Sequence, residues 1–374
     1  MKKVLAIAPY PYLPYFSGGQ KFIAQFYKHL SQQVQLTVIT VPGTDPALAN
    51  YNVIPLLKAG FSRYMDRSLV KKLTRLINDE GFETVIWEHP YYAWLATAVK
   101  KRTGIRTILH THNIEYQRFR STGRWWWPFL RAYEKWAFRK ADHLLFITPE
   151  DMAFATHKWK IPASGCSELP FGVEWDSQPR DREQASAAIR ALHGIGPGET
   201  ILFFNGLLSY APNLEALRFI IDEVNPVLKT MPGFRYRILV SGKGLPAEMN
   251  NLSAYIPENI SYTGFVEDID LYFRGSDLLL NPVQRGGGIK TKMVEAIAAG
   301  TTVIAGENGA TGMDPAICGN KLVVVADQDP RLFAEAIIKT AGKQELTPPQ
   351  FYTFYYWENI ISRMLPVLTD HSAG

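Results

Sequence analysis

Apolar residues in this chain form short runs that alternate with amphipathic segments along its whole length. In the first half, these runs predict strands at Val4–Ala8, Gln35–Thr40, Asn52–Leu57, Thr84–Glu88 and Arg106–Leu109. Helical spacing of apolar residues between the runs predicts helices at Gln20–Leu30, Arg67–Asn78 and Tyr91–Lys101. Because alternating strands and helices are typical of βαβ units, we predict an α/β fold with a parallel sheet.

The second half repeats this alternation after a polar stretch. Strands are predicted at Ile201–Asn205, Tyr236–Val240, Ile260–Gly264, Asp277–Asn281 and Thr301–Ala305, and helices at Leu214–Lys229, Asp268–Phe273, Ile289–Ala299 and Phe351–Leu368. The stretch 178–200 is polar and holds only a short helix, Arg182–Leu192. We therefore predict two domains, 1–178 and 201–350, joined by a linker at 179–200. A chain of 374 residues is long enough to bury two cores.

The most specific chemistry lies in residues 281–305, which read NPVQRGGGIKTKMVEAIAAGTTVIA. Glycines after a strand let the backbone approach a ligand, and a helix N-terminus favours a phosphate. Lys290 and Lys292 lie at the N-terminus of the predicted helix, where each positive charge is unfavourable by about 0.3–1 kcal/mol because of the helix dipole. An anion is therefore expected beside them. Glu295, on a neighbouring part of the same helix face, is placed to accept hydrogen bonds from ribose hydroxyls. The alternative is a glycine-rich turn with solvated lysines.

Polar residues also follow a strand in the first half. His112, Asn113 and Glu115 come after the strand that ends at Leu109, at the sheet edge where open α/β folds bind ligands. The alternative is a helix start capped by Asn113. His110 is better explained as a structural residue. Neither histidine has partners at a metal-site spacing, so no metal is predicted.

A glycine pair, Gly18 and Gly19, follows the first predicted strand and precedes the first helix. A strand, a glycine loop and a helix in this order can bind a ligand at the sheet edge. A tight turn explains the pair equally well, so the signal is weak.

Composition points to a reduced, cytosolic compartment. Cys166 and Cys318 match no metal or redox spacing and are expected as free thiols. The N-terminal apolar run has only five residues before Pro9, so we predict a strand and not a signal peptide. No apolar stretch reaches the roughly 18–20 residues that span a bilayer.

Positive charge is concentrated in one segment. Residues 100–140 carry eleven Lys/Arg and two acids, a local charge of +9 against +5 for the chain, so the rest carries about −4. Such asymmetry suits an acidic partner, either a membrane surface or nucleic acid. Within 118–140, a helical stripe that is typical of core comprises Trp127, Leu130, Tyr133, Trp136 and Ala137. The stripe leaves Trp125, Trp126 and the arginines unexplained.

The glycine–lysine segment resembles the donor-binding segment of family 4 glycosyltransferases, the retaining enzymes of the GT-B fold, in the branch with a GGG-x-R/K-x-K motif. His112, Asn113 and Glu115 resemble the H-N-x-E segment of the same branch. The resemblance implies two Rossmann-like domains facing a central cleft, with the last helix, 351–368, crossing back to the N-terminal domain. Two features depart from the family's commoner form. Gly287 stands where its first motif glutamate would be, and the NGLLSYAPN stretch lacks the usual arginine and lysine.

The resemblance also implies the roles of individual residues. The nucleotide-sugar donor would contact Gly206, Gly287, Gly288, Ile289, Lys290, Lys292 and Glu295. Catalysis would fall to His112, Lys290 and Lys292, and the acceptor side to Gly18, Gly19, Asn113 and Glu115. No cofactor is expected beyond the UDP- or GDP-linked sugar, and the lysines would replace a metal ion.

The expected function is sugar transfer to a glycan or lipid-linked acceptor in polysaccharide or glycolipid synthesis. Many family members act at the cytoplasmic membrane face, so residues 118–140 are expected to contact anionic lipid there, and nucleic acid is the disfavoured partner. The alternative is that the tryptophans belong to the core and the arginines are solvated. Two alternatives stay open: a sugar-nucleotide epimerase of the same fold, and a non-catalytic basic binding module.

Overall fold

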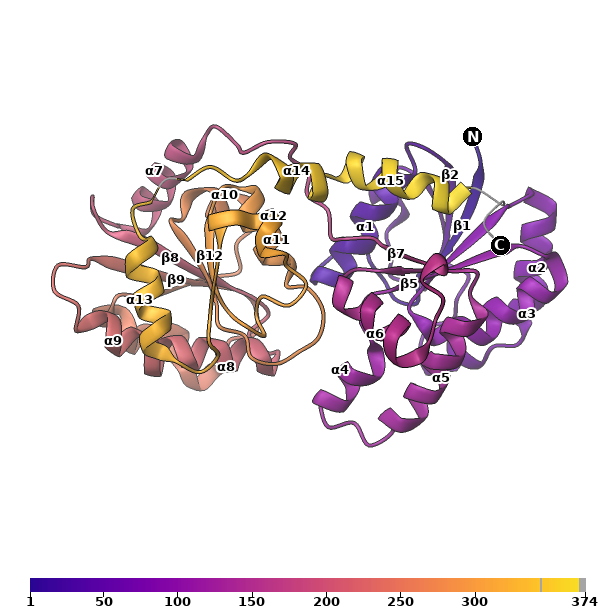
Figure 1. Ribbon diagram of the computed structural model, residues 1–374, viewed down its shortest axis with the longest axis horizontal. Helices are drawn as coiled ribbons and strands as arrows, with labels where there is room; N and C mark the ends of the chain where they lie inside the picture. Colours follow the sequence, from indigo (N-terminus) through magenta and orange to yellow (C-terminus); the bar gives the residue numbers. More distant parts are fainter. Residues whose placement is uncertain (344, 370–374) are drawn as a thin grey trace. The chain divides into compact units, whose positions relative to one another are not determined.

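The computed structural model of the protein describes residues 1–343 and 345–369. It divides the chain into two compact units. The first comprises residues 1–172 with the C-terminal segment from Trp357, and the second comprises Val173–Tyr356. Each unit has its own parallel sheet between helices, so the predicted α/β class with two Rossmann-like sheets is confirmed (Figure 1).

The first unit is built on a seven-stranded sheet in the order β3-β2-β1-β4-β5-β6-β7. Its strands are β1 (Lys3–Ile7), β2 (Gln35–Ile39), β3 (Asn52–Ile54), β4 (Thr84–Glu88), β5 (Arg106–Thr111), β6 (His143–Phe146) and β7 (Cys166–Glu168). Its helices are α1 (Gly18–Leu30), α2 (Ser68–Glu80), α3 (Ala93–Thr103), α4 (Glu115–Ser121), α5 (Trp127–Lys140), α6 (Pro149–Trp159) and α15 (Trp357–Thr369). Short 3₁₀ helices are η1 (Pro46–Leu48), η2 (Phe61–Met65), η3 (Pro90–Tyr92) and η4 (Ala163–Gly165).

The second unit is built on a six-stranded sheet in the order β10-β9-β8-β11-β12-β13. Its strands are β8 (Thr200–Asn205), β9 (Tyr236–Ser241), β10 (Ile260–Gly264), β11 (Leu278–Asn281), β12 (Thr302–Gly306) and β13 (Leu322–Val325). Its helices are α7 (Arg182–His193), α8 (Ala211–Phe219), α9 (Asn225–Lys229), α10 (Ile269–Gly275), α11 (Thr291–Ala298), α12 (Pro315–Cys318), α13 (Pro330–Thr340) and α14 (Pro349–Tyr355). A π-helical segment, η5 (Ile220–Val224), joins α8 to α9, and 3₁₀ segments lie at η6 (Ala247–Glu258) and η7 (Gly319–Lys321).

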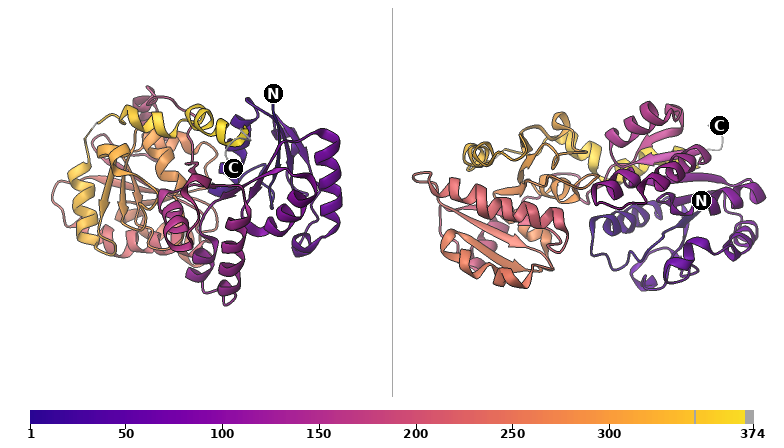
Figure 2. Two further views of the ribbon diagram at one scale, coloured as in Figure 1. Left: turned by 45° about the vertical axis from the view of Figure 1, so that its right-hand side comes forward. Right: turned by 90° about the horizontal axis from the view of Figure 1, so that it is seen from below.

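Strand alternation gives each sheet two apolar faces. In β1, Leu5 and Ile7 join the core beneath α2 and α3, while the fully buried Val4 and Ala6 are not part of that cluster and face the other side. Strands buried on both faces are typical of parallel sheets that helices cover on both sides (Figure 2).

The boundaries of the units differ from the predicted ones. Residues 179–200, predicted as a linker, belong to the second unit because α7 packs against α10. The predicted helix 351–368 is two helices, α14 and α15, with a break at Tyr356. Only α15 belongs to the first unit, where the buried Trp357 stacks on His29 of α1 at 5.6 Å between ring centroids. No described helix is both long and apolar enough to cross a membrane.

Each sheet has a switch point, where successive strands stop being added on one side of the first strand and begin to be added on its other side. In the first unit this switch point lies between β1 and β4, and in the second between β8 and β11. Ligands of open α/β sheets bind beyond the carboxyl ends of the strands at such points. The loops that follow these four strands are therefore the places to look for a site.

Candidate active site

The loop between β11 and α11 carries the predicted glycines and lysines. Gly286 and Gly288 have left-handed φ angles of 97° and 71°, which an α-helix cannot contain. The helix therefore begins at Thr291 and not at Ile289 as predicted, and Lys290 is its N-cap residue with φ and ψ of −91° and 93°.

The loop after β8 packs against this glycine loop. A Cβ atom on Gly286 would lie 3.1 Å from the hydroxyl oxygen of Tyr210. A Cβ atom on Gly242, whose φ is 146°, would lie 1.8 Å from the carbonyl oxygen of Gly206. The structure thus brings the loop that begins at Gly206 and contains Tyr210 against the glycine loop of residues 286–288, at the switch point of the second sheet.

Among the described residues, the hydrogen-bond partners of the two lysines of this loop are carbonyl groups, and Lys292 Nζ also lies 4.7 Å from the centroid of the Phe204 ring. Lys290 Nζ donates to the carbonyl oxygen of Gly288 at 2.8 Å, and Lys292 Nζ donates to that of Asn205 at 2.8 Å. Burial lowers the pKa of Lys290 to about 8, and burial together with the charge of Lys290 lowers the pKa of Lys292 to about 7. No carboxylate of the described residues forms an ion pair with either lysine. A bound anion would supply the negative charge that this loop lacks.

Glu295 lies on the second turn of α11 and is half-buried. It follows Lys292 by three residues, so both side chains leave the helix on neighbouring parts of one face. Its backbone carbonyl accepts a hydrogen bond from Ala299 at 2.9 Å, so the helix is regular at this position. This placement suits the predicted contact with ribose, which stays a prediction.

In the first unit, a buried carboxylate lies at the carboxyl end of β4. Glu88 Oε2 is 2.7 Å from Nε2 of His112 and 2.9 Å from Nδ1 of His110, and the Tyr27 hydroxyl donates to Oε1 at 2.6 Å. Burial disfavours ionisation of Glu88, yet the two histidines hold its carboxyl pKa well below the usual range. His110 lies inside β5 and is fully buried, which agrees with its interpretation as a structural residue.

Glu88, His110 and His112 are residue types that can ligate a metal, and their nitrogen and oxygen atoms lie within 4.8 Å of one another. Two ligands of a tetrahedral zinc ion, with bonds of about 2.0–2.1 Å, lie about 3.3 Å apart. The observed separations of 2.7 and 2.9 Å are shorter and correspond to direct contacts between the side chains. These separations fit a hydrogen-bonded cluster of the three side chains better than a zinc site.

A second buried group, next to the first, is centred on Glu115. Its Oε1 lies 3.1 Å from Nδ1 of His89, and its Oε2 accepts hydrogen bonds from the Tyr91 hydroxyl at 2.8 Å and from Arg118 at 2.6 Å. His89 Nε2 in turn lies 2.8 Å from the Tyr10 hydroxyl. With these partners Glu115 is fully buried. The prediction placed it on the acceptor side, but in this position it holds the neighbouring side chains and is not exposed to an acceptor.

Gly18 and Gly19 open α1 directly, two residues earlier than predicted, and the Ser17 hydroxyl caps the helix by accepting from the Gln20 amide. A Cβ atom on Gly19 would lie 3.8 Å from Nδ1 of His112. The structure therefore brings this glycine loop and the candidate histidine together at the switch point of the first sheet.

Asn113 is not the helix cap that the alternative interpretation required. The N-cap position of α4 is Ile114, and Asn113 is half-buried in the bend before it. The carboxylate of Glu134, on α5, instead accepts from the amides of Glu115 at 2.7 Å and Tyr116 at 3.0 Å. Burial raises the pKa of Glu134 to about 8.

Sequence reasoning assigned no role to Glu88, His89 or Glu134. Glu88 and His89 stand at a predicted strand end, the signal that identified His112, so the same rule would have found them. Glu134 lies in an aromatic helix, and no sequence pattern indicates that it caps a different helix.

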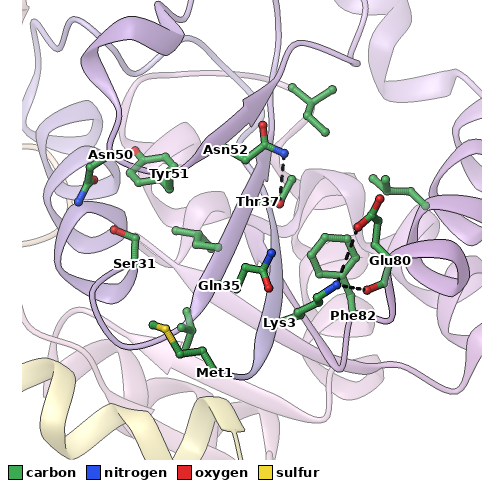
Figure 3. Close-up of a pocket in the computed structure, with 14 residues that line it drawn as sticks. Met1, Lys3, Ser31, Gln35, Thr37, Asn50, Tyr51, Asn52, Glu80 and Phe82 are labelled. Carbon is green, nitrogen blue, oxygen red and sulfur yellow. Dashed lines mark hydrogen bonds and ion pairs between the residues drawn. The ribbon is translucent and has the colours of Figure 1, made fainter.

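The cavity in Figure 3 lies elsewhere. Its volume is about 620 Å³, and Lys3, Gln35 and Glu80 are among its lining residues. Lys3 and Gln35 begin β1 and β2, so the cavity lies at the amino ends of these strands, whereas the loop with Gly18 and Gly19 follows the carboxyl end of β1. It is separate from the candidate site.

Two protein-family models match successive parts of the chain. The model of the family described as Glycosyltransferase Family 4 matches residues 16–176, and that of Glycosyl transferases group 1 matches residues 199–342. No curated protein sequence matches the chain significantly.

Solved structures resemble the chain over its whole length. Sucrose-phosphate synthase from Thermosynechococcus elongatus has a TM-score of 0.71 at 17% identity, with 98% of each chain covered. HepE from Anabaena, in complex with UDP and glucose, has a TM-score of 0.71 at 13% identity, with 99% of this chain and 100% of HepE covered. WaaG, a glycosyltransferase involved in lipopolysaccharide biosynthesis, has a TM-score of 0.63 at 15% identity, with 98% of this chain and 99% of WaaG covered.

At these identities the structural likeness establishes the GT-B fold alone. The family matches add the activity class, and the protein is a glycosyltransferase of GT-B type. Its first unit carries the family 4 match and its second unit the group 1 match, which contains the glycine–lysine loop.

Proposed function

We propose that this glycosyltransferase moves a sugar from a UDP- or GDP-linked donor to a glycan or lipid-linked acceptor, with retention of configuration at the anomeric carbon. The observation that carries the proposal is the pair of half-buried lysines, Lys290 and Lys292, at the N-terminus of α11, with no carboxylate to neutralise them among the described residues. Fold neighbours crystallised with UDP-glucose, or with ADP and acarbose, support a nucleotide as the anion.

The donor diphosphate would lie at the N-terminus of α11. Backbone N–H groups of the glycine loop and the first turn, together with Lys290 and Lys292, would bind its oxygens. Glu295 would accept hydrogen bonds from the ribose hydroxyls. Gly287, exposed in the loop, has no side chain to contact the donor sugar, so other residues would fix the sugar's orientation.

During transfer, the bond between the anomeric carbon and the phosphate oxygen breaks and the acceptor oxygen bonds to that carbon. Negative charge develops on the leaving diphosphate, where the lysines and the helix N-terminus stabilise it. The leaving phosphate oxygen takes the proton of the acceptor hydroxyl on the same face of the sugar, which preserves configuration. These cations replace the divalent metal ion that other transferases use at this position, so the proposed reaction is metal-independent.

The proposal is tested by titrating the protein with UDP-, GDP- and ADP-sugars in a calorimeter, and by following transfer to glycan and lipid-linked acceptors in EDTA. We expect one nucleotide class to bind and activity to survive chelation. Replacing Lys292 by Met removes one donor to the leaving group and should lower turnover by roughly 10²–10³. The matched control is Lys229→Met, which replaces an exposed lysine of α9. The proposal fails if no nucleotide binds, and epimer formation without an acceptor would favour the epimerase alternative.

We further propose that the hairpin of α4 and α5 contacts anionic lipid at the cytoplasmic face of the membrane, where a lipid-linked acceptor would be presented. The two helices lie side by side at the edge of the first unit, joined by residues 122–126 (Figure 1). Trp125 is 79% exposed and Phe129 is 72% exposed, and Arg120, Arg124 and Arg131 around them are exposed cations. Each cation near such a surface contributes roughly 1 kcal/mol, and indole favours the headgroup region.

Two parts of the predicted lipid-binding set are corrected by the structure. Trp126 is half-buried and packs on Phe119 at 4.6 Å between ring centroids, so it is not available to a membrane. Arg118 pairs with Glu115 in the buried cluster. The predicted core stripe lies inward, with Leu130 and Ala137 buried. The contact surface is therefore the hairpin tip around Trp125 and Phe129.

Co-sedimentation with vesicles tests the hairpin proposal. Binding should need anionic lipid, weaken with added salt, and fall in Trp125→Ser/Phe129→Ser and in Arg120→Gln/Arg124→Gln. The matched controls are Leu192→Ser, a 65% exposed apolar residue of α7, and Arg331→Gln/Lys339→Gln on α13. Equal binding to neutral and anionic vesicles, or none, would contradict the proposal and favour a soluble acceptor.

A further inference from the structure

Glu88 touches the candidate histidine of the first unit but has no assigned role. It is the last residue of β4 and is 1% exposed, and its Oε2 lies 2.7 Å from Nε2 of His112. The Tyr27 hydroxyl donates to its other oxygen at 2.6 Å, and His110 Nδ1 lies 2.9 Å from Oε2. These neighbours hold Glu88 in its ionised form, with its pKa below the usual range despite burial.

An ionised carboxylate has no proton to donate. The 2.7 Å contact with His112 is therefore a hydrogen bond that Nε2 donates, which places the ring proton on Nε2. Burial lowers the pKa of His112, so the ring is neutral near pH 7. A neutral ring protonated on Nε2 has an unprotonated Nδ1 that can only accept a hydrogen bond.

Nδ1 of His112 is directed at the glycine loop after β1. The Cβ position of Gly19 is 3.8 Å from this atom and 3.6 Å from the Tyr10 hydroxyl, so glycine leaves space above the ring nitrogen. Within the part of the chain that the structure describes, no hydrogen bond is made to Nδ1. The ring itself is fixed on one side by His89, which stacks on it with centroids 4.1 Å apart.

His89 has a φ of 62° and ψ of 160°, a region that non-glycine residues rarely adopt. Its side chain is nevertheless held at both nitrogens, by the Tyr10 hydroxyl at 2.8 Å and by Glu115 at 3.1 Å. The buried network therefore keeps His89 against His112 and limits rotation of the His112 ring.

We infer that Glu88 is a positioning residue that fixes His112 as the Nε2–H tautomer, so that Nδ1 can accept a hydrogen bond from a hydroxyl group of a ligand that binds beside Gly19. The identity of the ligand rests on the proposed function, whereas the tautomer does not depend on any activity. A hydroxyl group fits because it can donate to Nδ1, and a phosphate oxygen does not fit because it would face a nitrogen lone pair.

The tautomer is measured by nitrogen NMR on protein labelled with ¹⁵N in the histidine rings, with His112→Gln to assign the signals. In the wild-type protein, the His112 Nδ1 resonance should be that of an unprotonated nitrogen and Nε2 that of a protonated one. In Glu88→Gln the new amide can also donate to Nε2, so the Nδ1–H tautomer should appear. Tyr27→Phe, which removes a hydrogen bond to Glu88 without touching His112, is the matched control and should keep the wild-type tautomer.

A wild-type His112 protonated on Nδ1 would overturn the inference, and this measurement stands even if Glu88→Gln does not fold. An unchanged tautomer in a folded Glu88→Gln would overturn it as well. So would stoichiometric Zn²⁺ binding that Glu88→Gln abolishes, because Nε2 would then be a metal ligand and not a hydrogen-bond donor.

The ligand is tested by adding UDP and the UDP- or GDP-sugar that the protein binds. The Nδ1 signal should move with the nucleotide sugar and not with UDP alone, and kcat/KM should fall about ten-fold in Glu88→Gln, the loss of about one hydrogen bond. If no nucleotide binds to the wild-type protein, the proposed function fails and the tautomer result still stands. If the sugar binds and transfers but Nδ1 does not respond, the proposed role of Nδ1 fails alone.

Discussion

If the donor binds at Lys290 and Lys292 as proposed, its binding should be coupled to proton uptake, because these lysines have lowered pKa values of about 8 and about 7. Both shifts arise first from burial, which disfavours the charged ammonium group. A diphosphate bound beside them would favour the charged form and raise both pKa values toward or above the ordinary value of about 10.4.

The size of the coupling follows from these values. At pH 8, about half of Lys290 and about nine-tenths of Lys292 are neutral without ligand, so binding should take up about 1.4 protons. The fraction with both lysines charged falls about 500-fold between pH 7 and pH 9. That factor is the upper limit for the rise in the donor's dissociation constant, because a singly charged site still attracts the anion.

Calorimetry of a nucleotide sugar in two buffers of different ionisation enthalpy measures the uptake directly. The diphosphate of a nucleotide sugar does not titrate in this pH range, so the protons belong to the protein. Lys292→Met should lower the uptake at pH 8 by about 0.9 and flatten the pH dependence. Lys229→Met, on α9, should change neither.

The unliganded protein should show the opposite trend with pH. Because the folded-state pKa values of these lysines lie below the unfolded value, the unfolded chain binds more protons between about pH 7 and pH 10. Their contribution to the free energy of unfolding therefore rises with pH while donor affinity falls. A dissociation constant that stays constant from pH 7 to pH 9, with no proton uptake at pH 8, would refute the assignment of these lysines to the diphosphate.

Three further predictions follow from single residues. Glu295→Ala should weaken donor binding about ten-fold or more, since hydrogen bonds to a charged group contribute about 1.5–3 kcal/mol, and unchanged affinity would remove Glu295 from the site. Gly242→Ala should lower the free energy of unfolding by about 3 kcal/mol or more in urea denaturation, because its Cβ would collide with Gly206. Gly233→Ala, also at positive φ but in open space, should lose only about 1–2 kcal/mol, and equal losses would mean that the contact is not tight. Glu134→Met should cost about 1–3 kcal/mol at pH 7, because Met has no oxygen to accept from the amides of Glu115 and Tyr116, and a stability equal to wild type would mean that the cap is unimportant.

The periodic parts of the fold were predictable from the sequence alone. The strands Thr84–Glu88 and Ile260–Gly264 match their predicted bounds, and each ends at a charged or glycine residue. Element ends at glycines were less predictable. Gly286 and Gly288 take left-handed angles that delay the helix to Thr291, whereas Gly18 is itself helical. The presence of a glycine in the sequence does not indicate which of these conformations it adopts, because the conformation depends on what packs against the loop.

The candidate site divides in the same way. His112 and the lysines follow strands at the sheet edge, where open α/β folds bind ligands, so the sequence alone could select them as candidates. Their supporting residues were harder to find, because the contact between Glu88 and His112 joins two strands and that between Glu134 and α4 joins two helices. These contacts form only when the elements pack together, and no regular spacing in the sequence indicates them. Burial nevertheless limits where such partners can lie. A carboxylate at the end of a buried strand has a desolvation cost that hydrogen-bond donors offset, and the ends of neighbouring strands are one place to look for these donors, although Glu88 also accepts from Tyr27 of α1. Applied to Glu88, that rule selects the end of β5, where the next polar residues are His110 and His112.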